Sequence, residues 1–362
     1  MTDYYKYLRK ILFLFPAEFA HNLAIFALEN ELVPDQAKYC NKKLEISIAG
    51  LNFRNPVGLS AGFDKNANCI GNLMRQNFGF VEVGTTTPLP QEGNPKPRLF
   101  RLTEDEAIIN RLGFNNKGVE IFSQRLRQWK FGNFLANDFL VGANIGKNKN
   151  SPNDASDYLT CLEKVCGLCD YITINISSPN TPNLREMQKK ENLESLVKPL
   201  IARRNEIVKK LSVKSPIFIK ISPDEDDEGL ENIAQICLEN QVDGVIISNT
   251  TIKRNLGKNK AFADKHQQGG LSGRPLFNLS NKTLGKFYKI SNGKIPIIGV
   301  GGISTTEDAY KKIRLGASAV QLYTSLIYKG FSVVNEINRG LVELLEKDGF
   351  RSIKDAVGVD SL

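Results

Sequence analysis

Hydrophobic positions along this chain of 362 residues follow a helical period at first and a strand period after about residue 45. Within residues 4–34, aromatic and aliphatic side chains recur at helical spacing on both sides of Pro16, which predicts two short amphipathic helices. These helices either pack on the main domain as core or form a surface that lies on a membrane or admits a hydrophobic ligand. The pattern alone favours packing. Alternating apolar positions over 44–53 then predict a small β-hairpin.

Beyond the hairpin, short apolar, β-rich runs alternate with segments of helical length and period. The predicted strands are 56–60, 80–84, 139–145, 170–176, 216–221, 243–248, 296–300 and 318–322. The predicted helices are 66–77, 116–129, 154–168, 191–211, 228–240, 305–315 and 331–348. Strands that are apolar throughout and separated by helices indicate a parallel sheet buried on both faces.

Eight such units predict an α/β fold, a (β/α)8 TIM barrel with a small N-terminal helical domain. The main rival is an open, doubly wound dinucleotide-binding sheet. That fold requires GxGxxG after the first strand together with an acidic residue about 20 positions further on, and the sequence lacks this combination. We therefore expect one large barrel with its functional groups at the carboxyl ends of the strands.

Composition excludes several classes of function. The chain has 48 Lys and Arg against 39 Asp and Glu, a formal net charge of +9, but the basic residues are scattered, so we expect no nucleic acid partner. No apolar run reaches the ~18 residues that span a bilayer. The first ten residues lack the long apolar segment of a signal peptide, so we expect a reduced setting in which the six cysteines stay free.

Two local patterns resemble metal or redox motifs, and each has a simpler explanation. Cys166 and Cys169 form a CxxC, but no second pair accompanies it, and we predict a helix end that runs into a strand. The acidic run 224–228 opens a predicted helix, where carboxylates meet the positive end of the helix dipole. The only histidines are His21 and His266, too few for a His-rich site, and we expect no metal.

Amide, hydroxyl and lysine side chains stand at the carboxyl ends of nearly all the predicted strands. In chain order they are Ala61-Gly62-Phe63-Asp64-Lys65, Thr85–Thr87, Asn144, Asn175–Thr181, Lys220, Ser248–Thr251, Gly301–Gly302 and Tyr323–Thr324. Packing alone does not explain two lysines, three asparagines and several threonines at matching positions. The sequence therefore predicts a ligand-binding cleft at this end of the barrel.

The glycines indicate which ligand this cleft takes. Gly301 and Gly302 follow the seventh strand, where barrels commonly bind phosphate through backbone N–H groups, and 269–273 is a second glycine-rich stretch, expected to be flexible. Amides and hydroxyls with alternating donors and acceptors suit a flat heteroaromatic ring. Together these features predict flavin mononucleotide (FMN), with Lys220 near the flavin N1–C2 edge, where positive charge stabilises the reduced anion.

Seven motifs occur in order along the chain. They are AGFDK (61–65), NRLGFNN (110–116), GANIGKNK (142–149), INISSPNTPNLR (174–185), SNTT (248–251), GGLSGRPL (269–276) and GVGGIS (299–304). In this set and order the chain closely resembles dihydroorotate dehydrogenase, the flavin enzyme of pyrimidine synthesis, from about residue 16 to 358. The resemblance implies one FMN per subunit and the oxidation of (S)-dihydroorotate to orotate in de novo pyrimidine (UMP) biosynthesis.

Within that family the catalytic base distinguishes two classes, Cys in cytosolic enzymes and Ser in membrane-associated enzymes that reduce a quinone. This sequence has Ser178 at that position. The segment 16–24 resembles the helices that form the quinone tunnel, and His21 and Arg101 match positions at the quinone head-group site. The resemblance thus favours a quinone-tunnel and membrane domain over 1–40 and a barrel domain over 41–362, with the protein peripheral on the cytoplasmic face of the cell (inner) membrane.

The resemblance also assigns the remaining site residues. FMN contacts are implied for Ala61, Gly62, Phe63, Asp64, Lys65, Thr85, Asn144, Asn175, Lys220, Ser248, Gly273, Gly302, Tyr323 and Thr324. Dihydroorotate or orotate contacts are implied for Lys65, Asn110, Arg111, Leu112, Gly113, Phe114, Asn175, Asn180, Asn249 and Thr250. Ser248 departs from the Thr more usual there, which keeps the hydroxyl but loses a methyl group.

Two alternatives stay open at this point. One is a cytosolic relative linked to fumarate or NAD, against which Ser178 and the N-terminal helices argue. The other is a flavin-binding barrel without turnover. The acceptor expected from the resemblance is a membrane quinone, either ubiquinone or menaquinone, and the sequence does not distinguish the two.

Overall fold

A closed barrel of eight parallel strands forms the centre of the protein. The computed structural model describes residues 4–132, 139–151, 153–256 and 268–361. The barrel strands are β3 (Val57–Leu59), β4 (Phe80–Thr86), β7 (Leu140–Ile145), β8 (Tyr171–Asn175), β9 (Ile217–Ile221), β10 (Gly244–Ile247), β12 (Ile297–Val300) and β13 (Ala317–Leu322). Each strand pairs with the next in this order, and β13 closes the ring on β3. All eight predicted strands and the (β/α)8 fold are confirmed.

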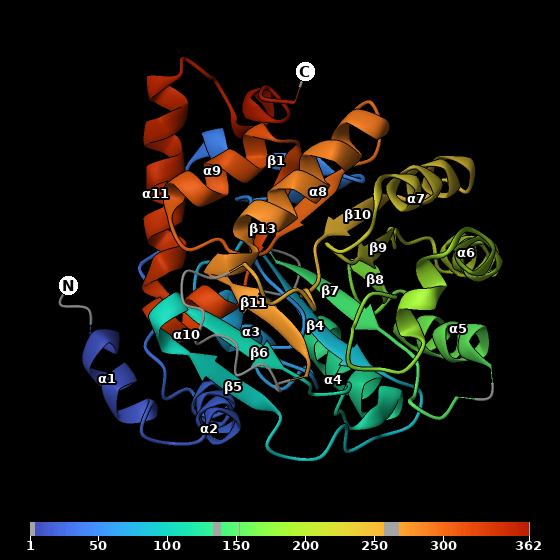
Figure 1. Cartoon of the computed structure of the whole chain (residues 1–362), viewed down its shortest axis with the longest axis horizontal. Coiled ribbons are helices and arrows are strands. Elements are labelled where there is room, and N and C mark those ends of the chain that lie inside the picture. Colours follow the sequence, from blue (N-terminus) through green and yellow to red (C-terminus); the bar gives the residue numbers. More distant parts are fainter. Residues whose placement is uncertain (1–3, 133–138, 152, 257–267, 362) are drawn as a thin grey trace.

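Helices surround the barrel, as Figure 1 shows. They are α3 (Ile70–Met74), α4 (Gly118–Gly132), α5 (Asp154–Val165), α6 (Lys190–Leu211), α7 (Asp227–Glu239), α8 (Phe277–Ile290), α9 (Thr306–Arg314), α10 (Thr324–Lys329) and α11 (Ser332–Lys347). The seven predicted helices are present, but α8 and α10 were not predicted. The buried face of α8 includes Ser280, Asn281 and Thr283, so its apolar period is weak in the sequence.

Aromatic rings close the amino-terminal end of the barrel. Phe80, Tyr171 and Phe218 are buried, and the ring centroids of Tyr171 and Phe218 lie 5.3 Å apart. Each ring lies over a glycine of a neighbouring strand: a Cβ added to Gly142 would come within 2.1 Å of the Tyr171 ring. The predicted hairpin is confirmed as β1 (Ile46–Ile48) and β2 (Leu51–Phe53). The opposite, carboxyl end of the barrel remains for the site.

A second, three-stranded antiparallel sheet was not predicted. It consists of β5 (Leu99–Leu102), β6 (Ala107–Asn110) and β11 (Gly270–Gly273), in the order β11-β6-β5. The expectation of a flexible stretch over 269–273 was therefore wrong for 270–273, which pairs with β6 along its whole length. This pairing joins segments about 160 residues apart, and no local pattern in the sequence indicates it.

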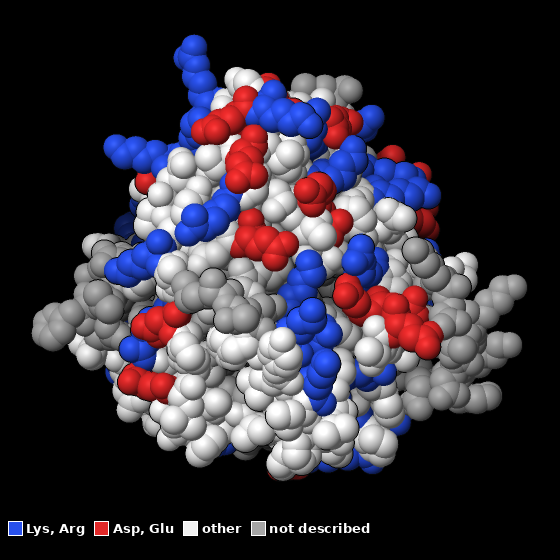
Figure 2. Space-filling view, turned by 90° about the vertical axis from the view of Figure 1, so that its left-hand side faces the viewer, with Lys and Arg blue, Asp and Glu red and all other residues white. Residues whose placement is uncertain are grey.

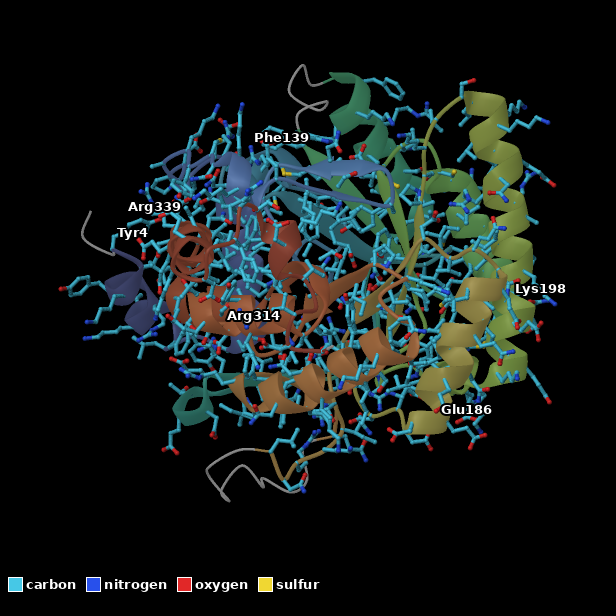
Figure 3. The ribbon with its side chains drawn as sticks, turned by 90° about the horizontal axis from the view of Figure 1, so that it is seen from above. Tyr4, Phe139, Glu186, Lys198, Arg314 and Arg339 are labelled. Carbon is cyan, nitrogen blue, oxygen red and sulfur yellow. The ribbon has the colours of Figure 1, made fainter. Side chains whose placement is uncertain are left out.

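The two predicted N-terminal helices are confirmed as α1 (Tyr5–Leu12) and α2 (Ala17–Glu29). They lie side by side at one edge of the molecule (Figure 1), where α1 contacts α10 and α2 contacts β5 and α3. Figure 3 shows Tyr4 at this edge, on the opposite side from Lys198 of α6. No helix among the described residues is long and apolar enough to cross a membrane.

The CxxC and the acidic run have the structural roles predicted for them. α5 ends at Val165, β8 starts at Tyr171, and the thiols of Cys166 and Cys169 are buried and unpaired between them. Desolvation raises the pKa of both thiols. The Asp226 carboxylate accepts a hydrogen bond from the Gly229 N–H (2.8 Å) and caps α7. Among the described residues no group of His, Cys, Asp and Glu could hold a metal, and His266 lies outside those residues.

Candidate active site

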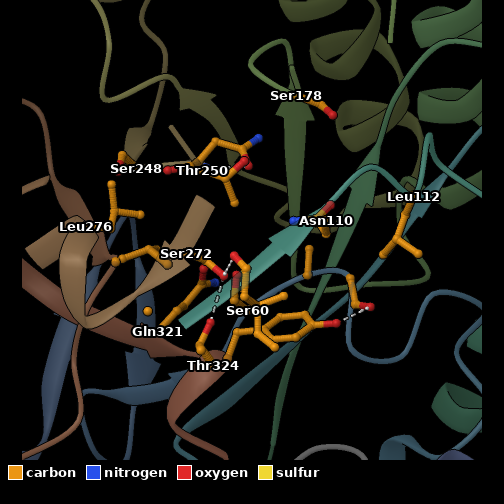
Figure 4. A pocket seen from close by; sticks show the side chains of 18 of the residues that line it. Ser60, Asn110, Leu112, Ser178, Ser248, Thr250, Ser272, Leu276, Gln321 and Thr324 are labelled. Atoms are coloured by element: carbon orange, nitrogen blue, oxygen red, sulfur yellow. Dashed lines mark hydrogen bonds between the residues drawn. The ribbon is translucent and has the colours of Figure 1, made fainter. Parts of the chain in front are cut away.

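A cleft of about 1270 Å³, partly open to solvent, lies at the carboxyl ends of the barrel strands. Of the residues implied to bind flavin, it is lined by Ala61, Gly62, Lys65, Thr85, Asn175, Lys220, Ser248, Gly273, Gly302, Tyr323 and Thr324. Of those implied for substrate and catalysis, it is lined further by Asn110, Leu112, Gly113, Phe114, Ser178, Asn180, Asn249 and Thr250. Figure 4 shows how side chains from distant strands and loops, such as Ser178, Asn110 and Gln321, surround this space.

Four of the residues implied for flavin or substrate do not line the cleft. Asp64 is buried and accepts hydrogen bonds from the N–H groups of its own loop, including that of Cys69 (2.9 Å), so it orders the loop that presents Lys65. Phe63 packs against the rings of His21 and Tyr323. The Arg111 guanidinium donates to the Pro97 carbonyl (2.9 Å), away from the cleft. The fourth, Asn144, lies directly beneath the cleft floor.

One end of the cleft is built from backbone with positive φ. Gly302 has φ +77°, and a Cβ there would come within 2.5 Å of Phe277. Gly273, at the end of β11, has φ +95°. Close by, the Thr324 hydroxyl donates to the Ser272 hydroxyl (2.9 Å), as Figure 4 shows. Glycine turns of this kind let backbone N–H groups approach an anion closely, so this end fits a phosphate group.

Three side chains that line the cleft have a buried polar atom with no hydrogen-bond partner among the described residues. The atoms are Oδ1 of Asn115, Oε1 of Gln321 and Oγ of Ser325, and the side chains of Gln321 and Ser325 are more than nine-tenths buried. A buried polar atom without a partner is unfavourable by about 1–3 kcal/mol. A polar ligand that reaches these atoms would satisfy them.

The floor of the cleft contains a buried cation and a buried carboxylate. The Lys220 ammonium donates to the Ser60 hydroxyl (3.1 Å) and lies 3.9 Å from the Glu82 carboxylate. Desolvation lowers the pKa of Lys220, and the charge of Glu82 opposes this shift. The floor therefore presents positive charge that Glu82 balances from beneath.

A second cation, Lys65, joins the cleft to helix α2. Its ammonium lies 3.2 Å from Nε2 of His21. Desolvation lowers the pKa of Lys65 to about 8, although the nearby Glu18 and Asp64 carboxylates raise it. Desolvation and the Lys65 charge lower the pKa of His21 well below its usual value, so the neutral ring accepts the hydrogen bond. Lys65 thus connects the cleft to the N-terminal helices through one hydrogen bond.

The second predicted quinone-site residue, Arg101, also contacts the N-terminal helices. Its guanidinium donates to the carbonyls of Phe13 (3.1 Å) and Phe15 (2.7 Å), in the turn between α1 and α2. It lies over the Phe13 ring, 4.5 Å from the ring centroid. His21 and Arg101 therefore lie along the contact between these helices and the barrel, and neither lines the cleft itself.

Ser178 lies in the loop that follows β8. The residue is 6% exposed and lines the cleft. Its hydroxyl accepts a hydrogen bond from the backbone N–H of Asn180 (3.3 Å). The loop is held from the other side, because Asn94 donates to the Asn180 carbonyl (3.1 Å) and Asn180 donates to Asn110 (3.0 Å). The serine hydroxyl is thus fixed at the edge of the cleft, near a donor that stabilises negative charge on its oxygen.

Known proteins similar to this chain decide its family. The family model for dihydroorotate dehydrogenase matches residues 43–345. A protein of Azorhizobium caulinodans named dihydroorotate dehydrogenase (quinone) is 46% identical over 358 residues, which cover 99% of each chain. The chain belongs to the dihydroorotate dehydrogenase family. Members of the family are flavin-dependent enzymes.

Other members of the family extend this similarity. The mitochondrial dihydroorotate dehydrogenase (quinone) of Oryza sativa subsp. japonica is 45% identical, over 96% of this chain and 78% of its own. The crystal structure of the dihydroorotate dehydrogenase of Eimeria tenella in complex with ferulenol has a TM-score of 0.88 and 40% identity, covering 95% of both chains. The ligand-free Eimeria tenella structure has the same TM-score at 41% identity. The resemblance to this family that the motifs indicated is confirmed.

Several residues of the family's cleft were not predicted from the sequence. Ser60, Ser272 and Gln321 line the cleft, and Glu82 lies beneath it. Glu82 had a visible signal, because it is the only charged residue in the apolar run FVEVG. A charge inside a strand that is buried on both faces needs partners inside the barrel.

Proposed function

We propose that this chain oxidises (S)-dihydroorotate to orotate in pyrimidine (UMP) biosynthesis, with one bound FMN per subunit and a membrane quinone as electron acceptor. The observation that carries the proposal is that one cleft brings together two strand-end lysines, a serine in the loop after β8 and several amides from segments far apart in the sequence. Lys65, Ser178 and Lys220 all line it. These groups match an anionic, planar, polar substrate beside a flavin.

The residues at the phosphate end and the floor fit FMN. Gly273 and Gly302 leave backbone room for a phosphate group, and Gln321 and Ser325 offer polar atoms that need partners. Thr85, Asn175 and Lys220 would hold the ring, with the Lys220 charge at its N1–C2 edge. The other proposed contacts come from Ala61, Gly62, Phe63, Asp64, Lys65, Asn144, Ser248, Tyr323 and Thr324. When bound, FMN supplies a two-electron acceptor.

The proposed substrate pocket lies between the loops after β8 and β10. Lys65 would pair with the substrate carboxylate, because it is a cation that lines the same cleft as the surrounding asparagines. Asn110, Asn180 and Asn249 would orient the ring amides. Leu112, Gly113, Phe114, Asn175 and Thr250 complete the proposed pocket, and Arg111 would act only by holding the loop of Pro97. Fixed donors and acceptors of this kind place a planar ring in one orientation.

Ser178 is the proposed base that takes the proton from C5 while a hydride leaves C6. A serine hydroxyl is a weak base at its usual pKa, so its developing negative charge needs a donor. The Asn180 N–H, 3.3 Å from the hydroxyl oxygen, is such a donor. Thr181, buried three residues further along the loop, is the candidate for the outlet of the proton.

The quinone is proposed to enter between the N-terminal helices, residues 1–40, and the barrel, residues 41–362. Leu14 is 83% exposed, and Tyr7, Ile11, Phe19 and Phe26 are exposed with it. Figure 2 views this side of the molecule, where the lower half over α1 and α2 is largely white with Lys and Arg grouped at its centre. An apolar face beside basic residues favours peripheral contact with an anionic membrane, here the cytoplasmic face of the cell (inner) membrane. His21 and Arg101 would contact the quinone head group.

Stopped-flow reduction tests the proposed base. Ser178→Ala should slow anaerobic bleaching of the flavin by dihydroorotate by ~10²-fold or more, the usual contribution of a general base. The affinity for orotate should stay near that of the wild type, because the change removes one hydroxyl. Ser178→Cys is the matched control and should retain more activity than Ser178→Ala, since a thiol can also take a proton. Bleaching of Ser178→Ala at the wild-type rate would show that another group is the base.

A further inference from the structure

Glu82 lies within the barrel, directly beneath the cleft floor, and is fully buried. It is the acceptor in every side-chain hydrogen bond that it forms. Its donors are Asn144 Nδ2 (2.8 Å), Gln321 Nε2 (2.8 Å), the Tyr171 hydroxyl (3.1 Å) and the Thr173 hydroxyl (3.2 Å). A carboxylate can only accept, whereas an amide group has one accepting and one donating end. Each amide next to Glu82 must therefore turn its nitrogen toward the carboxylate.

This requirement passes from one amide to the next. Because Asn144 gives its nitrogen to Glu82, its oxygen faces the cleft floor and accepts from the Thr85 hydroxyl (2.6 Å) and from Asn175 Nδ2 (3.2 Å). Asn175 is thereby fixed too, and its oxygen accepts from Asn249 Nδ2 (3.2 Å) and from the Ser177 N–H (3.4 Å). The relay ends there, because the Thr250 N–H donates to Asn249 Oδ1 (2.9 Å) and fixes that amide by itself. Asn175 and Asn249 both line the cleft.

A second branch of the same network consists of one residue, Gln321, which bonds to Glu82 and lines the cleft. Gln321 gives its nitrogen to Glu82, so its oxygen is the end left for another partner. That oxygen is buried and has no partner among the described residues, so it is an acceptor for a donor that reaches it. Glu82 itself lines no part of the cleft, and its effect on a ligand passes through these amides and through Lys220.

We propose that Glu82 is a positioning residue, whose carboxylate fixes the direction of the three floor amides and hence the pattern of donors and acceptors that the cleft offers to its ligands. The floor amides are those of Asn144, Asn175 and Gln321. This inference rests on the proposed function, since orotate is the probe. Glu82 therefore affects ligand binding through the direction of the amides as well as through its charge.

The geometry allows a test that separates the effect of amide direction on ligand binding from the effect of a substitution on folding stability. Of the four hydrogen-bond donors, only Asn144 bonds to Oε1 of Glu82, which also lies 3.9 Å from the Lys220 ammonium, while the other three donors bond to Oε2. In Glu82→Gln the carbonyl oxygen can keep the Oε2 partners, and the new NH₂ group confronts Asn144 Nδ2. Asn144→Asp creates the converse conflict, because two carboxylates then face each other. Combining the two changes restores one donor and one acceptor at this contact.

The experiment measures the orotate Kd of the FMN-loaded, full-length variants by titration of flavin absorbance, together with thermal unfolding. We expect the orotate Kd to rise at least tenfold in Glu82→Gln and in Asn144→Asp. In the double variant it should return to within about threefold of the wild type, since coupled neighbours are not additive. Tyr171→Phe removes the hydroxyl that bonds to Oε2 of Glu82 and contacts Gln321, but leaves the Glu82–Asn144 contact intact, so its Kd should stay within about twofold.

Three results would overturn the inference. They are a Glu82→Gln Kd within twofold of the wild type, a double variant no better than the weaker single variant, or a Tyr171→Phe variant as impaired as Glu82→Gln. If Glu82→Gln does not fold, Asn144→Asp and the double variant give the same comparison. Wild-type flavin that dihydroorotate fails to bleach would instead contradict the proposed function, whatever the variants do.

Discussion

The ion pair between Glu18 and Arg98 is the charged contact that ties helix α2 to the barrel, and Glu18→Gln should loosen that helix. Arg98 is 5% exposed, and its guanidinium donates to both Glu18 carboxylate oxygens, the shortest bond being 2.7 Å. It also donates to the carbonyls of Glu92 and Asn94. Glutamine keeps the shape of Glu18 but leaves the buried guanidinium without its counter-charge.

The size of the effect follows from the burial of the pair. Removing one partner of a fully buried ion pair is unfavourable by ~3–5 kcal/mol, whereas an exposed pair contributes at most ~1 kcal/mol. The Glu18 side chain is 16% exposed, and Arg98 keeps two backbone acceptors, so the value lies between these limits. We expect a loss of about 2 kcal/mol, which increases the population of detached α2 about 30-fold.

Hydrogen exchange followed by mass spectrometry reads this change directly. The amides of α2 should exchange about 30-fold faster in Glu18→Gln, while those of strand β8 stay as protected as in the wild type. Lys96→Gln is the matched control, because Lys96 lies 4.0 Å from Glu18 and is 68% exposed, so its loss should change α2 exchange less than about twofold. Unchanged exchange of α2 in Glu18→Gln, or an equal loss of protection in β8, would refute this account of the contact.

Two further predictions concern the cleft. The pKa of Lys65 is about 8, so its ammonium loses its proton as the pH rises through that value, and the orotate Kd should be constant below pH 7 and rise above pH 8. Lys65→Arg should show no such rise up to pH 9.5, because a guanidinium stays protonated. A wild-type Kd that is constant over the whole range would contradict the role of Lys65. Gly302→Ala should leave the purified protein with little flavin, because the added Cβ meets Phe277. Gly349→Ala is the control and should keep its flavin, since Gly349 has the same φ of +77° but no neighbour within 4 Å. The ratio of flavin to protein absorbance measures both.

The barrel was predictable because its strands are buried on both faces. A run such as 216–219 is apolar throughout, which is typical of a strand covered by helices on both faces. The strand ends were predictable for the same reason, since Lys220 and Asn175 break the apolar pattern where the strands stop. The sheet of β5, β6 and β11 was missed because pairing over about 160 residues has no local signal.

Side-chain direction was the least predictable feature of the site. Arg111 lies between Asn110 and Leu112, which both line the cleft, yet it turns to Pro97 and the Phe100 ring. Asp64 likewise serves its own loop rather than the cleft. Position along the chain determines which loop a residue belongs to, but packing and hydrogen bonds decide where the side chain points. The role of Glu82 could be inferred only once its four donors were known.

Anaerobic reduction followed by a choice of acceptors tests the central claim most directly. Dihydroorotate should bleach the flavin of the purified protein, and the colour should return at once when a soluble ubiquinone or menaquinone analogue is added, but not when fumarate or NAD is added. Rapid recovery of the colour with fumarate or NAD would place the enzyme in the class linked to fumarate or NAD instead. A flavin that dihydroorotate never bleaches would contradict the proposed function itself.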